Sequence, residues 1–442
     1  MTNIRTAVAL WLTTCLALLG MSACNDLPTD LGSDFVVDTA DTYRLLSSEV
    51  PLMLSFDNGR IDTFASGRPL FNAGPLYVGR LADGSEALSI LRFATINDVD
   101  ELDLFDPARY TIQSLKLRLQ VSSYAIGDTT SDLVDFGVHD LEWRDEETFG
   151  AFTTRTQIEN RREAGLPLFA QAEAAHFSGP IAFADSIFAV EVNGISQDLF
   201  RDWMRRRGEY VALRKEFEDR GEEPPADENY GLALLPTEGV NIIRSFATPE
   251  ISTLEDIPFS QLELVYQHVD STGVDTLLIE AGNDGTYVDT PPAPEKRFVL
   301  QGGSAWRYAI QLDFDMIPDL SRVAYAQLDL TIDKELTLEG RGGNRRSNAV
   351  TLRASEDGSL VQNTTLSRSV DIQADDSGTY LLTGLQTIIE NWLRNGGDEA
   401  FLLHTLSSEE QAEMDRLVFY GPDADDASKR PQLKVFYRTR PR

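Results

Sequence analysis

A short acidic loop near the end of the chain carries residue types that bind hard cations. Three carboxylates, Asp423, Asp425 and Asp426, stand within four residues of the sequence Gly-Pro-Asp-Ala-Asp-Asp. Carboxylate oxygens are the ligands that Ca²⁺ prefers, although the spacing is not that of an EF-hand loop. Aspartate is also common in solvated turns. Two interpretations of this loop therefore stay open, a calcium site and a solvated turn, and we expect no other cofactor.

The usual catalytic motifs are absent from the sequence. The four histidines show neither a His-x-His nor a His-Glu-x-x-His spacing, so no histidine metal motif is present. No Gly-x-Ser-x-Gly turn and no glycine-rich phosphate loop occurs. Acidic residues flank Trp143, but such clusters arise without a role in a chain with 71 Asp and Glu residues. We therefore predict that the protein is not an enzyme, with a glycan hydrolase as the second alternative.

Four tryptophans lie at positions where the sequence suggests a role for the indole ring. Trp203 and Trp392 lie on the apolar stripes of two predicted helices, and we expect both to be structural residues packed in a core. Trp143 and Trp306 stand near the ends of strand-like runs beside charged residues. An exposed ring at such a position can stack on a ligand, so these two are the candidate ligand-binding residues, with core packing as the alternative.

Cys24 ends an N-terminal segment with the features of an export signal. Arg5 is the only charged residue before it, and residues 7–20 form an apolar run. Such a run is too short for a permanent membrane helix and suits a cleaved signal. The ending Met-Ser-Ala-Cys resembles the lipobox, in which the cysteine is lipidated, although Met21 stands where leucine is usual. We predict a lipoprotein signal peptide over residues 1–23 and lipidation at Cys24, with an ordinary secretory signal as the alternative.

Composition limits the partners and the cross-links. The chain has 71 acidic and 39 basic residues, a formal charge of −32, and such a surface repels phosphate backbones. We therefore expect no nucleic-acid partner. Cys15 and Cys24 are the only cysteines, and Cys15 lies within the predicted signal peptide. We therefore expect the mature protein to have neither an internal disulfide nor a cysteine zinc site. After Cys24 no apolar run is long enough to cross a membrane, and we expect the lipid to be the only membrane anchor.

Strand-like patterns dominate the chain after residue 50. Residues 88–93, 115–121 and 327–332 alternate apolar and polar side chains, which places one face of a strand toward a core and the other toward water. Helical periodicity is confined to a few segments, among them residues 194–205 and 384–394. The pattern predicts a mainly β protein with antiparallel sheets.

The two helical segments belong to a long internal repeat. In each copy the helical segment follows one strand-like run and precedes three more, in the same order. Two strand-like runs upstream of each helix match as well. A repeat of this length indicates tandem domains rather than a solenoid. We predict two tandem antiparallel β-sandwich domains of the jelly-roll type over residues 51–281 and 298–442, each with one short capping helix.

The remaining segments are predicted to be a tether, a linker and two insertions. Residues 24–50 are polar and turn-rich, which favours a lipidated tether, and residues 282–297 are rich in glycine and proline, which favours a linker. The first domain carries insertions at about residues 144–178 and 205–229. Long loops on a β scaffold are common binding surfaces, and a purely solvated loop is the alternative.

The repeated order of elements resembles the DNRLRE-type β-sandwich module of bacterial surface proteins. The resemblance rests on the glycine-led helices with Trp203 or Trp392 and on a final Pro-x-Leu-x-Val-x-Tyr strand, best seen at residues 430–437. Residues 24–34 are similar to the opening of Bacteroidota surface lipoproteins that are grouped only as a domain of unknown function. These resemblances imply sandwiches related to carbohydrate-binding jelly rolls and supply no catalytic residues.

Together these features lead to one expected function and one main alternative. We expect a non-enzymatic lipoprotein of the cell envelope that is anchored in the outer membrane, is exposed at the cell surface, and binds or adheres to a glycan or protein. The alternative is an accessory lipoprotein subunit docked on an outer-membrane barrel assembly or a secretion machine. Fold resemblance does not decide between them, because function depends on particular sites.

Overall fold

The computed structural model of the chain contains two β-rich units. The described residues are 43–47, 75–93, 106, 108–144, 155–181, 188–225, 228, 230–247, 260–281, 283–302, 308–311, 317, 321–341, 350–355, 368–370, 372–374, 379–395, 400–405 and 413–438. The predicted signal peptide, Cys24 and Trp306 lie outside them. The sheets are antiparallel, which confirms the mainly β prediction. None of the described helices has the length and apolarity needed to cross a membrane.

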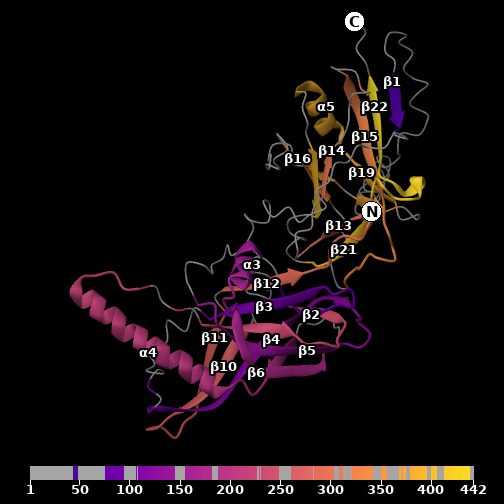
Figure 1. Cartoon of the computed structure of the whole chain (residues 1–442). Coiled ribbons are helices and arrows are strands. Elements are labelled where there is room, and N and C mark those ends of the chain that lie inside the picture. The colour runs from indigo at the N-terminus through magenta and orange to yellow at the C-terminus, as the bar shows by residue number, and fades with distance from the viewer. Residues whose placement is uncertain are drawn as a thin grey trace, which may run out of the picture.

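The larger unit, formed by the described residues between 75 and 289, is built on one eleven-stranded sheet that curls into a half-barrel (Figure 1). Its strands pair in the order β11 (Asp275–Glu280), β10 (Gln261–His268), β4 (Tyr110–Gly127), β9 (Ile242–Phe246), β2 (Leu76–Arg80), β3 (Glu86–Arg92), β8 (Gly231–Pro236), β5 (Leu133–Leu141) and β6 (Phe169–Pro180). Off this path, β12 (Asn283–Asp289) pairs with β3, and β7 (Phe188–Val192) pairs with β4.

Strand β4 shows how alternation makes the two faces of this sheet. Leu115 and Leu117 are buried in the main core and stand opposite Leu264 and Leu262 of β10. The side chains between them point to the other face, where Lys116 pairs with Glu263 at 2.9 Å. Burial of the leucine face stabilises the sheet by roughly 25 cal/mol per Å² of apolar surface removed from water. The predicted strand over residues 115–121 is therefore present with the expected orientation.

A second, smaller core lies on the opposite face of the larger unit. Helix α3 (Arg155–Glu163) contributes Ile158 to it, beside Leu88, Trp143 and Tyr287. Arg161 and Arg162 of the same helix lie over the rings of Trp143 and Tyr287. The insertion predicted at about residues 144–178 thus contains both α3 and β6, which extends the sheet beyond β5.

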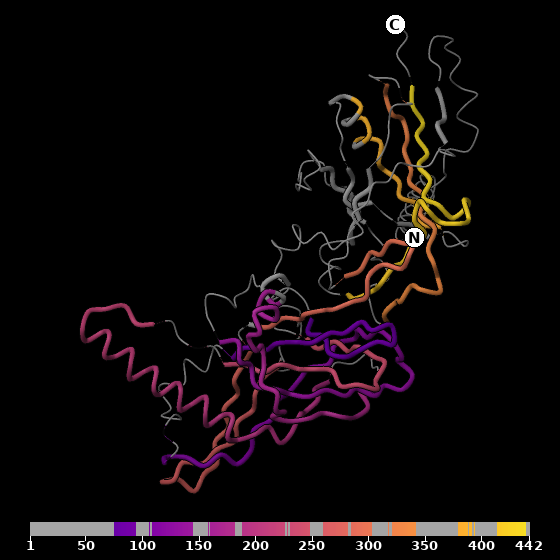
Figure 2. Tube along the Cα trace, viewed as in Figure 1, coloured from indigo at the N-terminus to yellow at the C-terminus, as the bar shows by residue number. Residues whose placement is uncertain are grey.

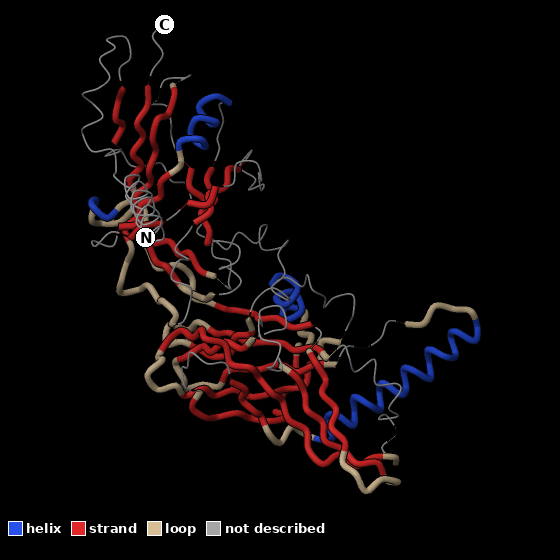
Figure 3. Tube along the Cα trace, turned by 180° about the vertical axis from the view of Figure 1, so that it is seen from behind, coloured by secondary structure: helices blue, strands red, loops and turns tan. Residues whose placement is uncertain are grey.

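Helix α4 (Gln197–Arg220) is much longer than the short capping helix that we predicted. It continues through most of the insertion expected at about residues 205–229 and ends at Gly221, which adopts the left-handed conformation with φ 68°. Good helix formers and ion pairs spaced four residues apart, such as Arg214 with Glu218 at 2.8 Å, stabilise this extension. Figures 1 and 3 show the helix reaching away from the sheet.

The smaller unit comprises the described residues from 297 to 438 together with β1. One sheet has the order β1 (Tyr43–Ser47), β22 (Gln432–Arg438), β15 (Arg322–Thr331), β19 (Thr379–Thr383) and β18 (Ile372–Ala374). A second has the order β14 (Tyr308–Gln311), β20 (Ala400–Thr405), β16 (Val350–Ser355) and β17 (Arg368–Val370), and β13 (Arg297–Gln301) pairs with β21 (Arg416–Tyr420). The short elements α5 (Gln386–Asn395) and η5 (Ala427–Lys429) complete the unit.

Two predicted connecting segments contain strands instead. The tether expected over residues 24–50 includes β1, which pairs along β22 at the opposite end of the sequence. The linker expected over residues 282–297 includes β12, which continues the larger sheet through its pairing with β3. Glycine and asparagine in this segment suggest a break in secondary structure. A strand edge forms hydrogen bonds with the backbone, however, so any residue with a free N–H and carbonyl can pair with it. Figure 2 shows the chain passing to the smaller unit directly after β12.

Candidate functional site

Helix α4 is anchored to the larger unit by its first half only. Its buried residues are Phe200, Trp203, Met204 and Arg207, and none lies beyond position 207. The Trp203 ring is 1% exposed and lies 5.9 Å from the ring of Tyr230 and 6.2 Å from that of Phe93. The structure thus places Trp203 in the core, as predicted. Trp392 belongs to α5, but its side chain lies outside the described part of the chain.

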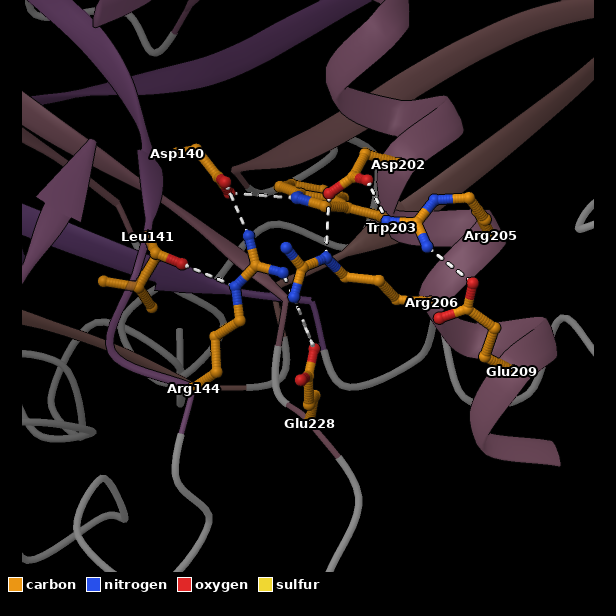
Figure 4. A network of polar contacts seen from close by, with 9 residues as sticks. All are labelled: Asp140, Leu141, Arg144, Asp202, Trp203, Arg205, Arg206, Glu209 and Glu228. Carbon is orange, nitrogen blue, oxygen red and sulfur yellow. Dashed lines mark hydrogen bonds and ion pairs between the residues drawn. The ribbon is translucent and has the colours of Figure 1, made fainter. Parts of the chain in front are cut away.

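Asp140 of β5 connects the base of α4 to the sheet. Its carboxylate accepts a hydrogen bond from Nε1 of Trp203 at 2.9 Å and one from the guanidinium of Arg144 at 2.5 Å (Figure 4). Arg144 is held in turn by a bond from its Nε to the carbonyl of Leu141 at 3.1 Å. Burial raises the pKa of Asp140, and this effect exceeds the opposite effects of Arg144 and Trp203. A half-buried carboxylate with two directed donors positions the helix and the sheet relative to each other.

A chain of alternating charges runs outward from Asp140 along the helix. Glu228 lies 3.6 Å from the Arg144 guanidinium and 3.7 Å from that of Arg206. Arg206 donates from Nε to Asp202 at 2.8 Å. Burial alone would raise the pKa of Asp202, but hydrogen bonds from Arg205 and Arg206 lower it. The network includes the returning chain at Glu228, so it fixes the angle at which α4 leaves the body (Figure 4).

The side chains of the second half of α4 are exposed or half-buried. Tyr210, Leu213 and Phe217 are spaced three and four residues apart, so they lie along one side of the helix. Leu213 is 39% exposed. The Tyr210 hydroxyl donates to the carbonyl of Pro225 at 3.2 Å, and Arg220 lies over the Phe217 ring. The arrangement can present an apolar ridge to another molecule.

Trp143 is not the exposed stacking residue that the sequence suggested. Its side chain is 1% exposed and packs in the smaller core with Leu168 and Ile158. The Arg161 guanidinium lies 5.4 Å from the ring centroid and covers it further. The prediction is wrong because the following insertion folds back as α3 over this face. Trp306, the other candidate, lies outside the described residues.

The acidic loop at residues 423–426 makes the contacts of an ion-paired turn. Asp425 accepts a hydrogen bond from the Lys296 ammonium at 2.5 Å, and this bond lowers the pKa of Asp425. Asp426 caps η5 by accepting from the backbone N–H of Ser428 at 3.0 Å, and Asp423 is exposed. Within the described residues no group of three His, Cys, Asp or Glu side chains is placed to hold a metal ion. These contacts are those of the turn interpretation.

One polar cluster was not anticipated from the sequence. His176 of β6 lies between Asp135 of β5 and Glu173, at 3.1 and 3.3 Å. Burial raises the pKa of Asp135, but hydrogen bonds from Ser178 and Thr237 and the nearby imidazole lower it overall. Glu173 lies three residues before His176 on β6, whereas Asp135 reaches them because the β5–β6 register pairs residues about forty positions apart, with irregularities between Val138 and Leu141. No local spacing signals the contact of Asp135 with His176.

Comparisons with known proteins identify no relative of this chain. The chain matches no protein-family model, no curated protein and no solved structure.

Proposed function

We propose that the chain is a non-catalytic lipoprotein of the outer-membrane surface that binds a protein partner through the second half of α4. The observation that carries the proposal is the division of this helix into a buried base and an exposed end. An isolated helix is only marginally stable in water, so a rigid base keeps the exposed end helical before binding. An apolar ridge on a preformed helix is suited to the groove of a partner protein.

Charge also favours α4 as the contact surface. The whole chain carries −32, whereas residues 209–220, the second half of α4, have three basic and four acidic side chains and so a formal charge of only −1. An acidic partner that approaches this part of the helix therefore meets less repulsion than one that approaches a strongly acidic face. The burial of Trp143 removes one of the two residues that supported glycan stacking, and so supports a protein partner over a glycan.

The N-terminal segment supports the location. Arg5, the apolar run over residues 7–20 and the Met-Ser-Ala-Cys ending are the features of a lipoprotein signal. The resemblance of residues 24–34 to Bacteroidota surface lipoproteins supports the outer face of the outer membrane. Each buried methylene of a lipid chain contributes about 0.8 kcal/mol to membrane attachment, so several acyl chains are a sufficient anchor.

Replacing Cys24 by alanine is expected to release the protein from the membrane. The variant has no site for the lipid, so it should appear in the soluble fraction of the envelope or in the medium, folded as the native chain is. Fractionation after washing in high salt and in carbonate measures this. A Cys24→Ala protein that stays with the membrane after both washes would contradict lipid as the only anchor.

Glutamate at Leu213 and at Phe217 is expected to remove the partner. Losing two apolar contacts at the centre of an interface costs at least about 2 kcal/mol, a loss of about thirtyfold in affinity. The measurement is the amount of partner that co-purifies in stoichiometric ratio after mild detergent extraction of the membrane. Leu166→Glu is the matched control, since Leu166 is also an exposed leucine, 51% accessible, but lies outside α4.

The same experiment distinguishes the alternatives. Loss of the partner with the α4 variants and its retention with Leu166→Glu support the proposal, and a barrel protein as the partner makes the chain an accessory subunit. Equal retention in all variants places the contact elsewhere. Retention of the protein on a glycan matrix that is unaffected by the α4 variants would favour the glycan hypothesis.

A further inference from the structure

A carboxylate lies within the contact between the two β units. Asp415, just before β21 in the smaller unit, accepts a hydrogen bond on Oδ1 from the Tyr124 hydroxyl of β4 at 2.6 Å. The same oxygen accepts from the backbone N–H of Gly340 at 2.8 Å. The Tyr124 hydroxyl in turn accepts from the N–H of Met414 at 2.9 Å. One oxygen of Asp415 therefore joins a strand of the larger unit to a loop of its own unit.

Backbone pairing and packing surround this carboxylate. Ala125 and Arg341 form a two-way bridge between the units, with N–H to carbonyl distances of 3.0 and 2.6 Å. Met414 is fully buried in a cluster with Tyr77, Leu81 and Ile126 of the larger unit, among others. The Tyr124 ring lies so close to Gly340 that a Cβ there would be 2.4 Å from ring atoms. This contact, formed by residues 338–341 and 413–416 against β2 and β4, is called the junction below.

The charged groups around Asp415 are mostly acidic. The negative charges of Glu413 and Glu339, in the same unit, raise the pKa of Asp415. The Arg416 guanidinium lies 3.8 Å from Asp83 and donates to the carbonyls of Pro291 and Pro292. Among the described residues, Arg341 and the hydroxyls of Tyr77, Tyr124 and Tyr380 also lie near Asp415, and burial raises the pKa values of the three tyrosines. Burial is also the main reason that the pKa of Asp415 rises to about 6, against the hydrogen bonds from Tyr124 and Gly340, which lower it.

We propose that protonation of Asp415 stabilises the junction, so that acidic pH holds the two units together and neutral pH loosens their contact. The sign follows from linkage: the closed junction binds the proton more tightly than the open one, in which the carboxyl is exposed to water. Closing is therefore most favourable below the ordinary pKa of 3.8 and weakens as the pH rises toward 6. The closing constant changes by about fiftyfold between pH 4 and pH 7.

Hydrogen exchange tests the proposal on the full chain, because it measures opening even when the closed form dominates. The amides to follow are those of Ala125 and Arg341, whose bonds cross the junction. After correction for the intrinsic effect of pH, their protection is expected to fall by about fiftyfold from pH 4 to pH 7. Peptides from β10 serve as the internal control, and their protection should change much less.

Asp415→Asn separates protonation from other effects of pH. Asparagine keeps an oxygen that accepts from Tyr124 and Gly340 but carries no charge, so the junction amides should stay protected at both pH values. Tyr124→Phe lacks the hydroxyl and should lower protection at pH 4. Native protection that is the same at pH 4 and pH 7, or an identical pH response in Asp415→Asn, would overturn the proposal. Unchanged exchange in β10 shows that each variant is folded.

Discussion

Replacing Trp203 by alanine is expected to destabilise the larger unit by about 3–5 kcal/mol, a large part of the roughly 5–15 kcal/mol that stabilises a domain. The indole is 1% exposed and packs among Phe93, Phe200 and Tyr230. Alanine would leave a cavity between the sheet and α4. It would also remove the donor that Asp140 accepts at 2.9 Å, leaving a half-buried carboxylate with one directed partner fewer.

Two further variants identify the cause of this loss. Trp203→Phe keeps an aromatic ring but lacks the N–H, so it should cost less than alanine and raise the pKa of Asp140 further. Leu213→Ala lies on the same helix at a residue that is 39% exposed, and should change stability by no more than about 0.5–1 kcal/mol. Urea unfolding followed by circular dichroism measures all three. A Trp203→Ala protein as stable as Leu213→Ala would contradict the core assignment.

Replacing Gly79 by alanine is expected to cost at least about 3 kcal/mol, because the new methyl group has no room. Gly79 of β2 has φ 144°, and a Cβ there would lie 2.0 Å from the carbonyl oxygen of Ile242 and 2.7 Å from the Cα of Ile243. Both atoms belong to the backbone of β9, with which β2 pairs, so neither can rotate away. The variant must separate the two strands or break their register.

Gly84→Ala is the matched control for that prediction. Gly84 also has a positive φ, 91°, but a Cβ there meets nothing within 4 Å. Its substitution should cost only the conformational preference of alanine, about 1–2 kcal/mol. The difference between the two unfolding free energies then measures the steric contact between β2 and β9. Equal losses in both variants would show that the close approach at Gly79 relaxes freely.

Alternation and helical periodicity predicted the local structure well because both depend on near neighbours in sequence. Leu115 and Leu117 face the core and Lys116 faces out, as a period of two requires. Trp203 is buried because it shares the apolar stripe of α4 with Phe200 and Met204. The end of α4 was also encoded locally, in the helix-forming residues up to Arg220 and the glycine that follows. The predicted helix ends too early, near residue 205, because seven of the residues from 209 to 220 are charged, which is typical of a solvated insertion.

The contacts that define the candidate site and the junction depend on residues far apart in the sequence. Asp140 and Trp203 are 63 positions apart, and Tyr124 and Asp415 are 291 apart, so no spacing rule relates them. Trp143 is buried because α3 folds over it, and β12 is a strand because the edge of β3 is available to it. The sequence alone determined the strand faces, the start of α4 and the acidic charge of the chain, and it predicts the lipid anchor. Tertiary structure decided which polar groups are buried together, because this depends on strand register and on the packing of the two units.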